Sequence, residues 1–367
     1  MKAAQNNKKV VPTKKVKPNA KGKSIGAVVK SKAFAMESKK EKDHFEGVVG
    51  QRRAKRELGF YLSNHLESAS VLPHFLFAGS KGDGKTHLAK KFGKNLPDLQ
   101  NPEKKNKAFY TLNGGAILNP TILLEDVLNP RQDQYCTIFI DEAHALPKKV
   151  QTVLLSILEP NRQNRTNYTF NDIDYVFDFR KITFIFATTE EDQINHALKD
   201  RLRHITLEPY NERELAEIIE MCLEGQVSFE GDLLNELSKY VRRNARAANF
   251  VAENVKSFGV PIFKKAQFDI LKEKLSMFPR GVSYNEVRIL QILRADGECA
   301  LGHLASRMAQ TVKSIQKEGE PYLIAMGLME ISGHRRITGA GQAYLKALED
   351  DWLIVAEKRD ENKAEAF

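Results

Sequence analysis

The chain has 367 residues, of which 42% are hydrophobic, and its 57 lysines and arginines exceed its 47 aspartates and glutamates to give a net charge of +10. It contains no apolar run near the ~18 residues of a membrane helix and no secretory signal at its start, so we expect neither a membrane protein nor an exported one. Its three cysteines are isolated and form no Cys-x-x-Cys pair, so we expect neither a disulfide framework nor a zinc site, and a reducing cytoplasm is the expected compartment.

The excess positive charge lies at the N-terminus. Residues 1–42 contain 13 lysines and only two acidic residues, whereas the rest of the chain has a net charge of −1. This segment has neither helical nor strand periodicity, so we expect it to be disordered. It would either contact phosphate backbones without sequence preference or serve as a solubilising or targeting extension.

Strand and helix patterns alternate from about residue 43 to residue 208. We expect helices over 51–68, 86–95, 121–128 and 148–158, and strands over 75–78, 109–113, 137–140, 182–187 and 205–207. Such alternation predicts an α/β domain of three layers around a parallel sheet.

A glycine-rich turn follows the first of these strands. Residues 79–86 (GSKGDGKT) fit the pattern G-x-x-x-x-G-K-[ST] at every fixed position. A strand, a glycine turn and a helix start direct backbone N–H groups at a phosphate chain, so we expect ATP to bind here. Lys85 would contact the β- and γ-phosphates and the Thr86 hydroxyl would hold Mg²⁺. The other expected contacts are Gly79, Gly82, Asp83, Gly84 and His87.

A second motif follows the apolar strand at 137–140. Asp141 and Glu142 stand directly after it, where ligands bind beside parallel strands. We expect Asp141 to hold the Mg²⁺ shell and Glu142 to polarise the attacking water as a general base. The chain is therefore predicted to hydrolyse ATP, although an acidic turn with no catalytic role is the alternative.

The second half of the chain has a different pattern of predicted elements. Helical patterns over 212–226, 231–241, 244–257 and 264–275 indicate a small all-helical domain over 209–278. Beyond a linker at 279–281, we expect helices near 284–294, 300–308 and 311–325, a polar hairpin over 330–338 and a helix over 342–348. Three helices with a β-wing predict a winged-helix DNA-binding domain over 279–350, followed by a charged tail over 351–367.

Several short motifs, taken in order, resemble those of RuvB, the AAA+ motor family of Holliday-junction branch migration. The likeness covers roughly residues 43–349, and the downstream motifs are more diagnostic than the phosphate loop. The motifs are Val48-Val-Gly-Gln51, Asp141-Glu-Ala-His144, Ala187-Thr-Thr189, Leu198-Lys-Asp-Arg201, Leu207-Glu-Pro-Tyr210 and Glu320-Pro-Tyr-Leu-Ile324.

The resemblance implies two residues that act on the γ-phosphate end of ATP. Thr189 matches the first sensor, near the γ-phosphate and the lytic water, with Thr188 a nearly equal choice. Arg201 matches the arginine finger, which in this family reaches the ATP of a neighbouring subunit. A homo-oligomer, expected to be a hexamer, would then be a condition for activity.

Other implied residues lie around the adenine and in the helical domain. Arg246 matches the second sensor, an arginine that couples the γ-phosphate to closure of the lid, although this chain has Asn-Ala-Arg where the family has Gly-x-Pro-Arg. Tyr210 matches a tyrosine that packs on the adenine, and Val49 and Gly50 would line the same pocket.

The resemblance also implies partners. Arg335 and Arg336 lie at the predicted wing tip, where the family contacts DNA through basic residues. Residues 161–180 alternate Tyr175, Phe177 and Phe179, which predicts a β-hairpin; RuvB has a hairpin here that docks RuvA. In this chain the hairpin is equally consistent with a purely structural role.

The sequence departs from the family in its phosphate loop. Asp83 brings a negative charge to the phosphates, unfavourable unless its side chain points outward or meets Lys81. The favoured function is a DNA translocase acting in recombination and repair on duplex or junction DNA. A loader of helicases or clamps and a nucleotide-gated DNA-binding adaptor with little hydrolysis are the alternatives.

Overall fold

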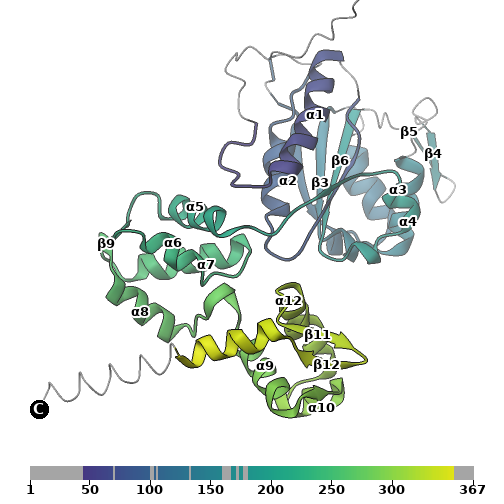
Figure 1. Ribbon diagram of the computed structural model, residues 1–367. Helices are drawn as coiled ribbons and strands as arrows, with labels where there is room; N and C mark the ends of the chain where they lie inside the picture. Colours follow the sequence, from purple (N-terminus) through teal and green to yellow (C-terminus); the bar gives the residue numbers. More distant parts are fainter. Residues whose placement is uncertain are drawn as a thin grey trace, which may run out of the picture. The chain divides into compact units, whose positions relative to one another are not determined.

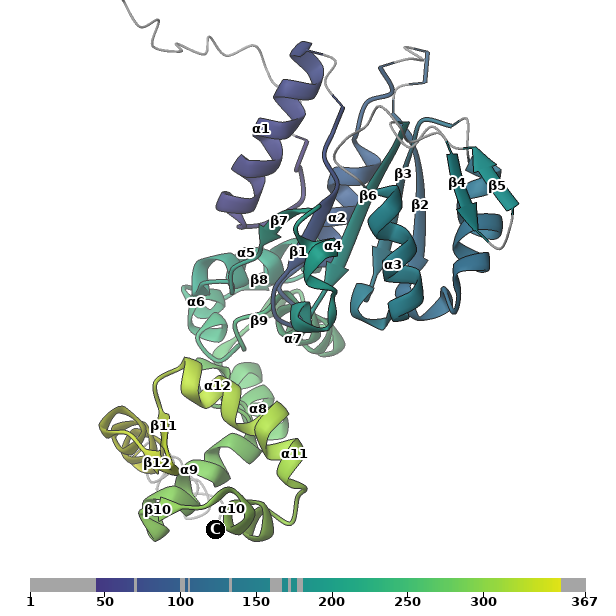
Figure 2. The ribbon, with the colours of Figure 1, turned by 90° about the vertical axis from the view of Figure 1, so that its right-hand side faces the viewer.

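The computed structural model describes residues 44–350, except 69–70, 100–102, 105, 132–133, 159–166, 171–172 and 177–180. The lysine-rich segment 1–42 and the C-terminal segment 351–367 lie outside the described residues, so the predictions made for them stay predictions. In the described part of the chain, no helix combines the length and apolar character that a membrane span requires. Figures 1 and 2 show the described elements from two sides.

A parallel sheet of five strands carries the first part of the chain, in the order β2-β3-β6-β1-β7. The predicted α/β architecture is confirmed, because all five strands form close to their predicted ranges. Strand β6 lies between β1 and β3, so the C-terminal ends of these three strands are neighbours. The strands are β1 (Phe75–Ala78), β2 (Ala108–Asn113), β3 (Cys136–Asp141), β6 (Ile182–Thr188) and β7 (Arg203–Thr206).

Helices cover both faces of this sheet. On one face α1 (Arg52–Ser68) and α2 (Lys85–Lys94) pack, and on the other η2 (Ile122–Leu128), α3 (Lys148–Ile157) and α4 (His196–Lys199). In β1, Phe75 and Phe77 join the first cluster and Leu76 the second. Because successive strand side chains point to opposite faces, a strand buried on both is largely apolar, which explains the continuous apolar runs.

Two predicted helices are irregular. The range 121–128 forms the π-helix η2, and the range 311–325 divides into α11 (Val312–Ser314), the π-helical η9 (Ile315–Gly319) and α12 (Glu320–Ala325). Pro321 stands at the start of α12. Since proline has no N–H to donate to an earlier carbonyl, regular α-helical bonding cannot run through this point.

The helical domain contains four helices around one hydrophobic cluster. They are α5 (Glu212–Leu223), α6 (Leu233–Ser238), α7 (Ala245–Ser257) and α8 (Lys265–Lys274). Helix α5 ends earlier than predicted, because Glu224 takes the left-handed conformation with φ 52°. A parallel pair of two-residue strands, β8 (Ser228–Phe229) and β9 (Ile262–Phe263), was not predicted.

The last domain is a winged helix with its own hydrophobic cluster, as predicted. Helices α9 (Tyr284–Asp296) and α10 (Leu301–Met308) and the helix over 339–350 surround it. The wing is the antiparallel pair β11 (Met329–Ser332) and β12 (His334–Ile337), joined by Gly333. A short strand, β10 (Glu298–Cys299), pairs with β12 and was not predicted.

The predicted hairpin between α3 and β6 is present. Its strands β4 (Asn167–Phe170) and β5 (Ile173–Val176) pair antiparallel. Phe177 and Phe179 lie outside the described residues, so the predicted alternation of aromatic side chains on one face remains untested.

Candidate nucleotide site and wing

The phosphate loop, residues 79–86, joins β1 to α2. Gly84 is the N-cap of α2 with φ 88°, and Gly82 has φ 93°. A Cβ on Gly84 would lie 2.5 Å from the Tyr210 hydroxyl, and one on Gly82 would lie 2.7 Å from the Asn244 side-chain oxygen. Both positions therefore require glycine, for backbone conformation and for space.

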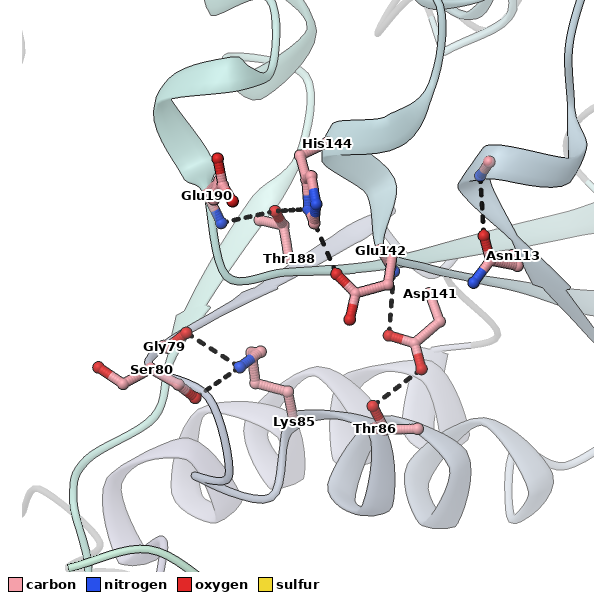
Figure 3. Close-up of polar contacts among 11 residues, drawn as sticks. Gly79, Ser80, Lys85, Thr86, Asn113, Asp141, Glu142, His144, Thr188 and Glu190 are labelled. Carbon is pink, nitrogen blue, oxygen red and sulfur yellow. Dashed lines mark hydrogen bonds and ion pairs between the residues drawn. The ribbon is translucent and has the colours of Figure 1, made fainter. Parts of the chain in front are cut away.

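Lys85 occupies the centre of the loop. Its Nζ donates to the carbonyls of Gly79 at 2.9 Å and Ser80 at 2.7 Å (Figure 3). Burial lowers the pKa of Lys85, and the nearby acidic groups oppose this shift. The charged side chains that act on it are Asp83, Glu142, Asp141 and Arg246, the last lowering the pKa further.

Asp83 turns back into the loop. Its Oδ2 accepts a hydrogen bond from the Ser80 N–H at 2.6 Å, and the residue is only 3% exposed. The side chain therefore points neither outward nor to Lys81, the two arrangements that the sequence suggested. Burial raises the pKa of Asp83, although the Ser80 N–H and Lys85 act in the opposite direction. A buried negative charge thus lies in the loop where a triphosphate is expected.

Replacing Asp83 with asparagine should tighten ATP binding. The asparagine Oδ1 can still accept from the Ser80 N–H, so only the charge is lost. A partly screened charge contributes about 1 kcal/mol, which corresponds to an affinity gain of about fivefold. Because the pKa of Asp83 is raised, the gain should fade as the pH falls through that pKa and the wild-type carboxyl becomes neutral.

Titration with a fluorescent ATP analogue at neutral and acidic pH would measure this difference. The exposed Lys81→Ala variant is the control for changes in the loop that leave Asp83 in place. Equal or weaker binding by Asp83→Asn at neutral pH would show that the carboxylate does not oppose the nucleotide.

Thr86 and Asp141 meet at the end of the sheet. The Thr86 hydroxyl donates to Asp141 Oδ2 at 2.9 Å, and the Glu142 N–H donates to Asp141 Oδ1 at 3.0 Å (Figure 3). A hydroxyl and a carboxylate oxygen are the hard ligands that Mg²⁺ prefers. This donor set therefore fits the predicted metal.

Glu142 belongs to a chain of polar contacts that the sequence did not reveal. His144 Nδ1 lies 3.4 Å from Glu142 Oε2 and 3.1 Å from Thr188 Oγ1, which also accepts from the Glu190 N–H at 3.0 Å (Figure 3). His144 thus fixes Glu142 relative to the end of β6.

The structure distinguishes the two sensor candidates by position. Thr188 is 1% exposed and holds the hydroxyl in this contact chain. Thr189, the predicted first sensor, follows β6 and is exposed. Its role stays a prediction, and Thr188 is the residue whose contacts lead to Glu142.

The two predicted arginines occupy different places. Arg246 is the second residue of α7 and lies close enough to Lys85 to lower the pKa of that lysine. Arg201 is half-buried just after α4, where its Nη1 donates to the Ala197 carbonyl at 2.9 Å. Of these two arginines, only Arg246 lies beside the phosphate loop of its own chain.

The helix α7 also contacts the loop through its backbone. The Ala245 N–H donates to the Gly82 carbonyl at 2.9 Å, and the Asn244 side chain caps α7 by accepting from the Ala247 N–H at 2.9 Å. Asn244 therefore serves as the helix cap in the Asn-Ala-Arg run where the sequence departs from the family pattern.

The predicted adenine-side residues surround the same loop. Tyr210 is 4% exposed and Val49 is 7% exposed, and both join the hydrophobic cluster of the helical domain. Gly50 has φ 60°, and a Cβ there would collide with the Glu214 carboxylate at 2.7 Å. His87 is exposed, and its Nε2 lies 3.2 Å from the Gly47 carbonyl. These positions are compatible with the predicted pocket.

Gln51 joins three segments of this site and was missed at the sequence level. Its Nε2 donates to the carbonyls of Asp83 at 3.2 Å and Glu208 at 2.7 Å, while its Oε1 accepts from the Glu208 N–H at 3.1 Å. The residue is 5% exposed with φ 52°. It belongs to the Val48–Gln51 motif, which is the sequence feature that could have pointed to it.

The two wing arginines differ in their surroundings. Arg335 donates from Nε to Glu320 Oε1 at 2.7 Å and from Nη2 to Oε2 at 3.3 Å, and the two side chains are 12% and 5% exposed. Such a bidentate buried pair holds the guanidinium inside the domain. Arg336 pairs with Glu298 at the surface and is 44% exposed. Of the two arginines, Arg336 is therefore the better candidate for the predicted DNA contact.

Two protein families match parts of the chain. The ATPase family associated with various cellular activities (AAA) matches residues 75–210, and the RuvB C-terminal winged helix domain matches residues 279–346. The two matches correspond to the parallel sheet with its phosphate loop and to the domain that carries the wing.

Similar proteins share most of the chain. A protein of Phytoplasma mali named Holliday junction branch migration complex subunit RuvB is 28% identical over 300 residues, covering 79% of this chain and 87% of the relative. The protein of the same name from Campylobacter jejuni (strain RM1221) is 27% identical over 311 residues, with coverages of 81% and 88%.

Solved structures show the same fold. The Thermotoga maritima RuvB Holliday junction branch migration motor has a TM-score of 0.63 at 23% identity and covers 81% of this chain. A mutant of that protein has a TM-score of 0.65 at 22% identity and covers 83% of this chain and 98% of its own.

Proposed function

Since this chain is a RuvB-like AAA ATPase, we propose that it is an oligomeric DNA translocase that uses ATP to migrate Holliday junctions in recombination and repair. One observation carries the proposal: an AAA ATPase match that includes the phosphate loop lies in the same chain as a match to the RuvB C-terminal winged helix domain. The division into an ATPase domain (43–208), a lid (209–278) and a winged helix (279–350) belongs to the same proposal, as does a cytoplasmic location.

In this proposal the residues of one chain bind ATP and prepare water for attack. Lys85 would leave the loop carbonyls that it now contacts and bind the phosphates. Thr86 and Asp141 would hold Mg²⁺, which neutralises charge on the phosphates when bound. Glu142, held by His144, would take the proton of the attacking water, with a threonine at the end of β6 near that water.

Lid movement would carry this chemistry to DNA. Arg246 and the bond from the Ala245 N–H to the Gly82 carbonyl link α7 to the loop. At the other end of the lid, Arg242 donates from Nη1 to both Glu286 oxygens, at 3.0 and 3.1 Å. Because Glu286 belongs to α9 and is 1% exposed, this pair would transmit lid motion to the winged helix.

Assembly completes the proposed site. Arg201 would act in trans on the ATP of a neighbouring copy, in a ring that we propose to be a hexamer. Arg336 would contact DNA phosphates from the wing, and such contacts position a protein without reading sequence. The hairpin of β4 and β5 is the proposed docking element for a RuvA-like partner.

A second candidate is a nucleotide-gated DNA-binding adaptor that hydrolyses little ATP. The buried carboxylate of Asp83 favours it, because a negative charge in the phosphate loop opposes a triphosphate. No particular contact among the described residues supports the remaining candidate, a loader of helicases or clamps.

Steady-state ATP turnover with and without four-way junction DNA tests the proposal. A translocase should hydrolyse ATP faster with the junction, and Arg336→Ala should reduce that stimulation while leaving the rate without DNA unchanged. Junction unwinding, measured with fluorescently labelled arms, should likewise be slower for Arg336→Ala than for the wild type. Slow turnover that does not respond to DNA would favour the adaptor.

A further inference from the structure

We propose that the winged helix contains a zinc site formed by Asp296, Cys299 and His303, which the spacing of the cysteines in the sequence did not predict. Each side chain offers one ligand atom, and these atoms all lie within 4.8 Å of one another. A thiolate sulfur, an imidazole nitrogen and a carboxylate oxygen are the three ligand types of protein zinc sites. Among the described residues, this is the one group of histidine, cysteine and acidic side chains that meets this spacing.

Three structural elements hold these ligands. Asp296 is the last residue of α9, Cys299 lies in β10 and His303 lies in the first turn of α10. Asp296 and His303 are seven positions apart in the sequence. A bound ion would therefore fasten the end of one helix to the start of the next.

The Asp–His pair already has the spacing of two zinc ligands. His303 Nε2 lies 3.2 Å from Asp296 Oδ2. Two atoms bound at ~2.0–2.2 Å to one tetrahedral ion lie about 3.3–3.6 Å apart. The Cys299 sulfur forms a longer bond to zinc, of about 2.3 Å, and lies within 4.8 Å of the other two ligand atoms.

The second oxygen of Asp296 has a different partner. Its Oδ1 lies 3.5 Å from Arg307 Nη1, whereas Oδ2 faces His303. Ligating carboxylates are commonly held by an outer group that orients them. The arginine thus leaves one carboxylate oxygen available to the ion while steadying the other.

Cys299 determines which metal fits. The residue is 1% exposed, and its Sγ lies 3.5 Å from the Ala300 carbonyl. Cys299 is a free cysteine, and a divalent ion that binds its sulfur displaces the thiol proton. Because thiolate and imidazole favour zinc over the hard Mg²⁺ ion, this site differs chemically from the nucleotide site.

The site also lies beside the wing. In the β10–β12 pair, Cys299 is opposite Arg335 and Glu298 is opposite Arg336. An ion held by Cys299 would brace β10 against the helices, and β10 in turn supports the strand that carries both arginines. Since the chain supplies three ligands, a water molecule would take the fourth position of the tetrahedral ion, and we assign this zinc the role of holding the wing in place.

The test uses the full-length protein loaded with zinc and separated from unbound metal by gel filtration. We expect one zinc ion per chain by mass spectrometry of the metal, and competition with a chromophoric chelator gives its affinity. His303→Ala should weaken binding on the order of 100-fold, since even outer-shell changes cost about 10- to 100-fold. Cys299→Ser should do the same and should remove the sulfur-to-metal absorption band of the cobalt-loaded protein.

Two matched controls separate this site from adventitious binding. His196 and Asp200 form another Asp–His pair at 3.2 Å, so His196→Ala tests whether such a pair alone binds zinc. Cys222, half-buried in the lid, provides the control Cys222→Ser. Because the His303 side chain is 57% exposed, His303→Ala should fold even if Cys299→Ser does not. Absence of zinc from the loaded wild type, or full retention of zinc by His303→Ala, would overturn the proposal.

Discussion

Replacing Glu142 with glutamine should lower the turnover number for ATP by about 10²- to 10⁴-fold, the range expected for a general base. Glutamine has nearly the same shape but cannot take a proton from water. Its amide still lies beside His144, so the end of the sheet should keep its arrangement. Nucleotide affinity should stay close to wild type, because Lys85 and the loop N–H groups are unchanged.

Steady-state turnover and a separate ATP-binding titration would measure these two quantities. Glu190→Gln is the matched control, because Glu190 contacts Thr188 through its backbone N–H, and that contact survives the substitution. A Glu142→Gln protein that turns over ATP at the wild-type rate would remove Glu142 from the proposed mechanism. Loss of binding together with turnover would show instead that Glu142 supports the loop.

The sequence predicted the strands and the phosphate loop because their signals are local. A strand buried on both faces is largely apolar, and residues 184–187 (Phe-Ile-Phe-Ala) form one continuous apolar run. The loop depends on glycines at fixed spacing, of which Gly82 and Gly84 have positive φ in the structure. Such features need no knowledge of distant residues.

Contacts between distant residues were not predictable in the same way. His144 meets Thr188 across 44 residues because β3 and β6 are neighbours in the sheet, and Gln51 meets Glu208 across 157 residues. Neither pairing follows from a local pattern. The same limit explains why Arg335 was predicted as a DNA contact, since its partner Glu320 lies on a different element.

Replacing Arg201 with alanine should lower ATP turnover by about 10³- to 10⁵-fold, the range reported for arginine fingers. The reason is that a guanidinium placed against the γ-phosphate offsets the charge that develops in the transition state. Binding of ATP to a single protomer should be unaffected, since Arg201 would serve the neighbouring copy. Arg201→Lys should also be impaired, because lysine keeps the charge but lacks the planar fork.

Turnover of the purified oligomer measures the loss, and Arg203→Ala is the control because Arg203 is a nearby exposed arginine on β7. The decisive experiment mixes Glu142→Gln and Arg201→Ala proteins, each nearly inactive alone. In a mixed ring, some interfaces pair an intact glutamate on one copy with an intact arginine on the next, so turnover should partly return. The recovered rate should depend on the mixing ratio and be greatest at intermediate values. If no ratio restores turnover although mixed rings are verified, the active site is not shared between copies and Arg201 must act within its own chain.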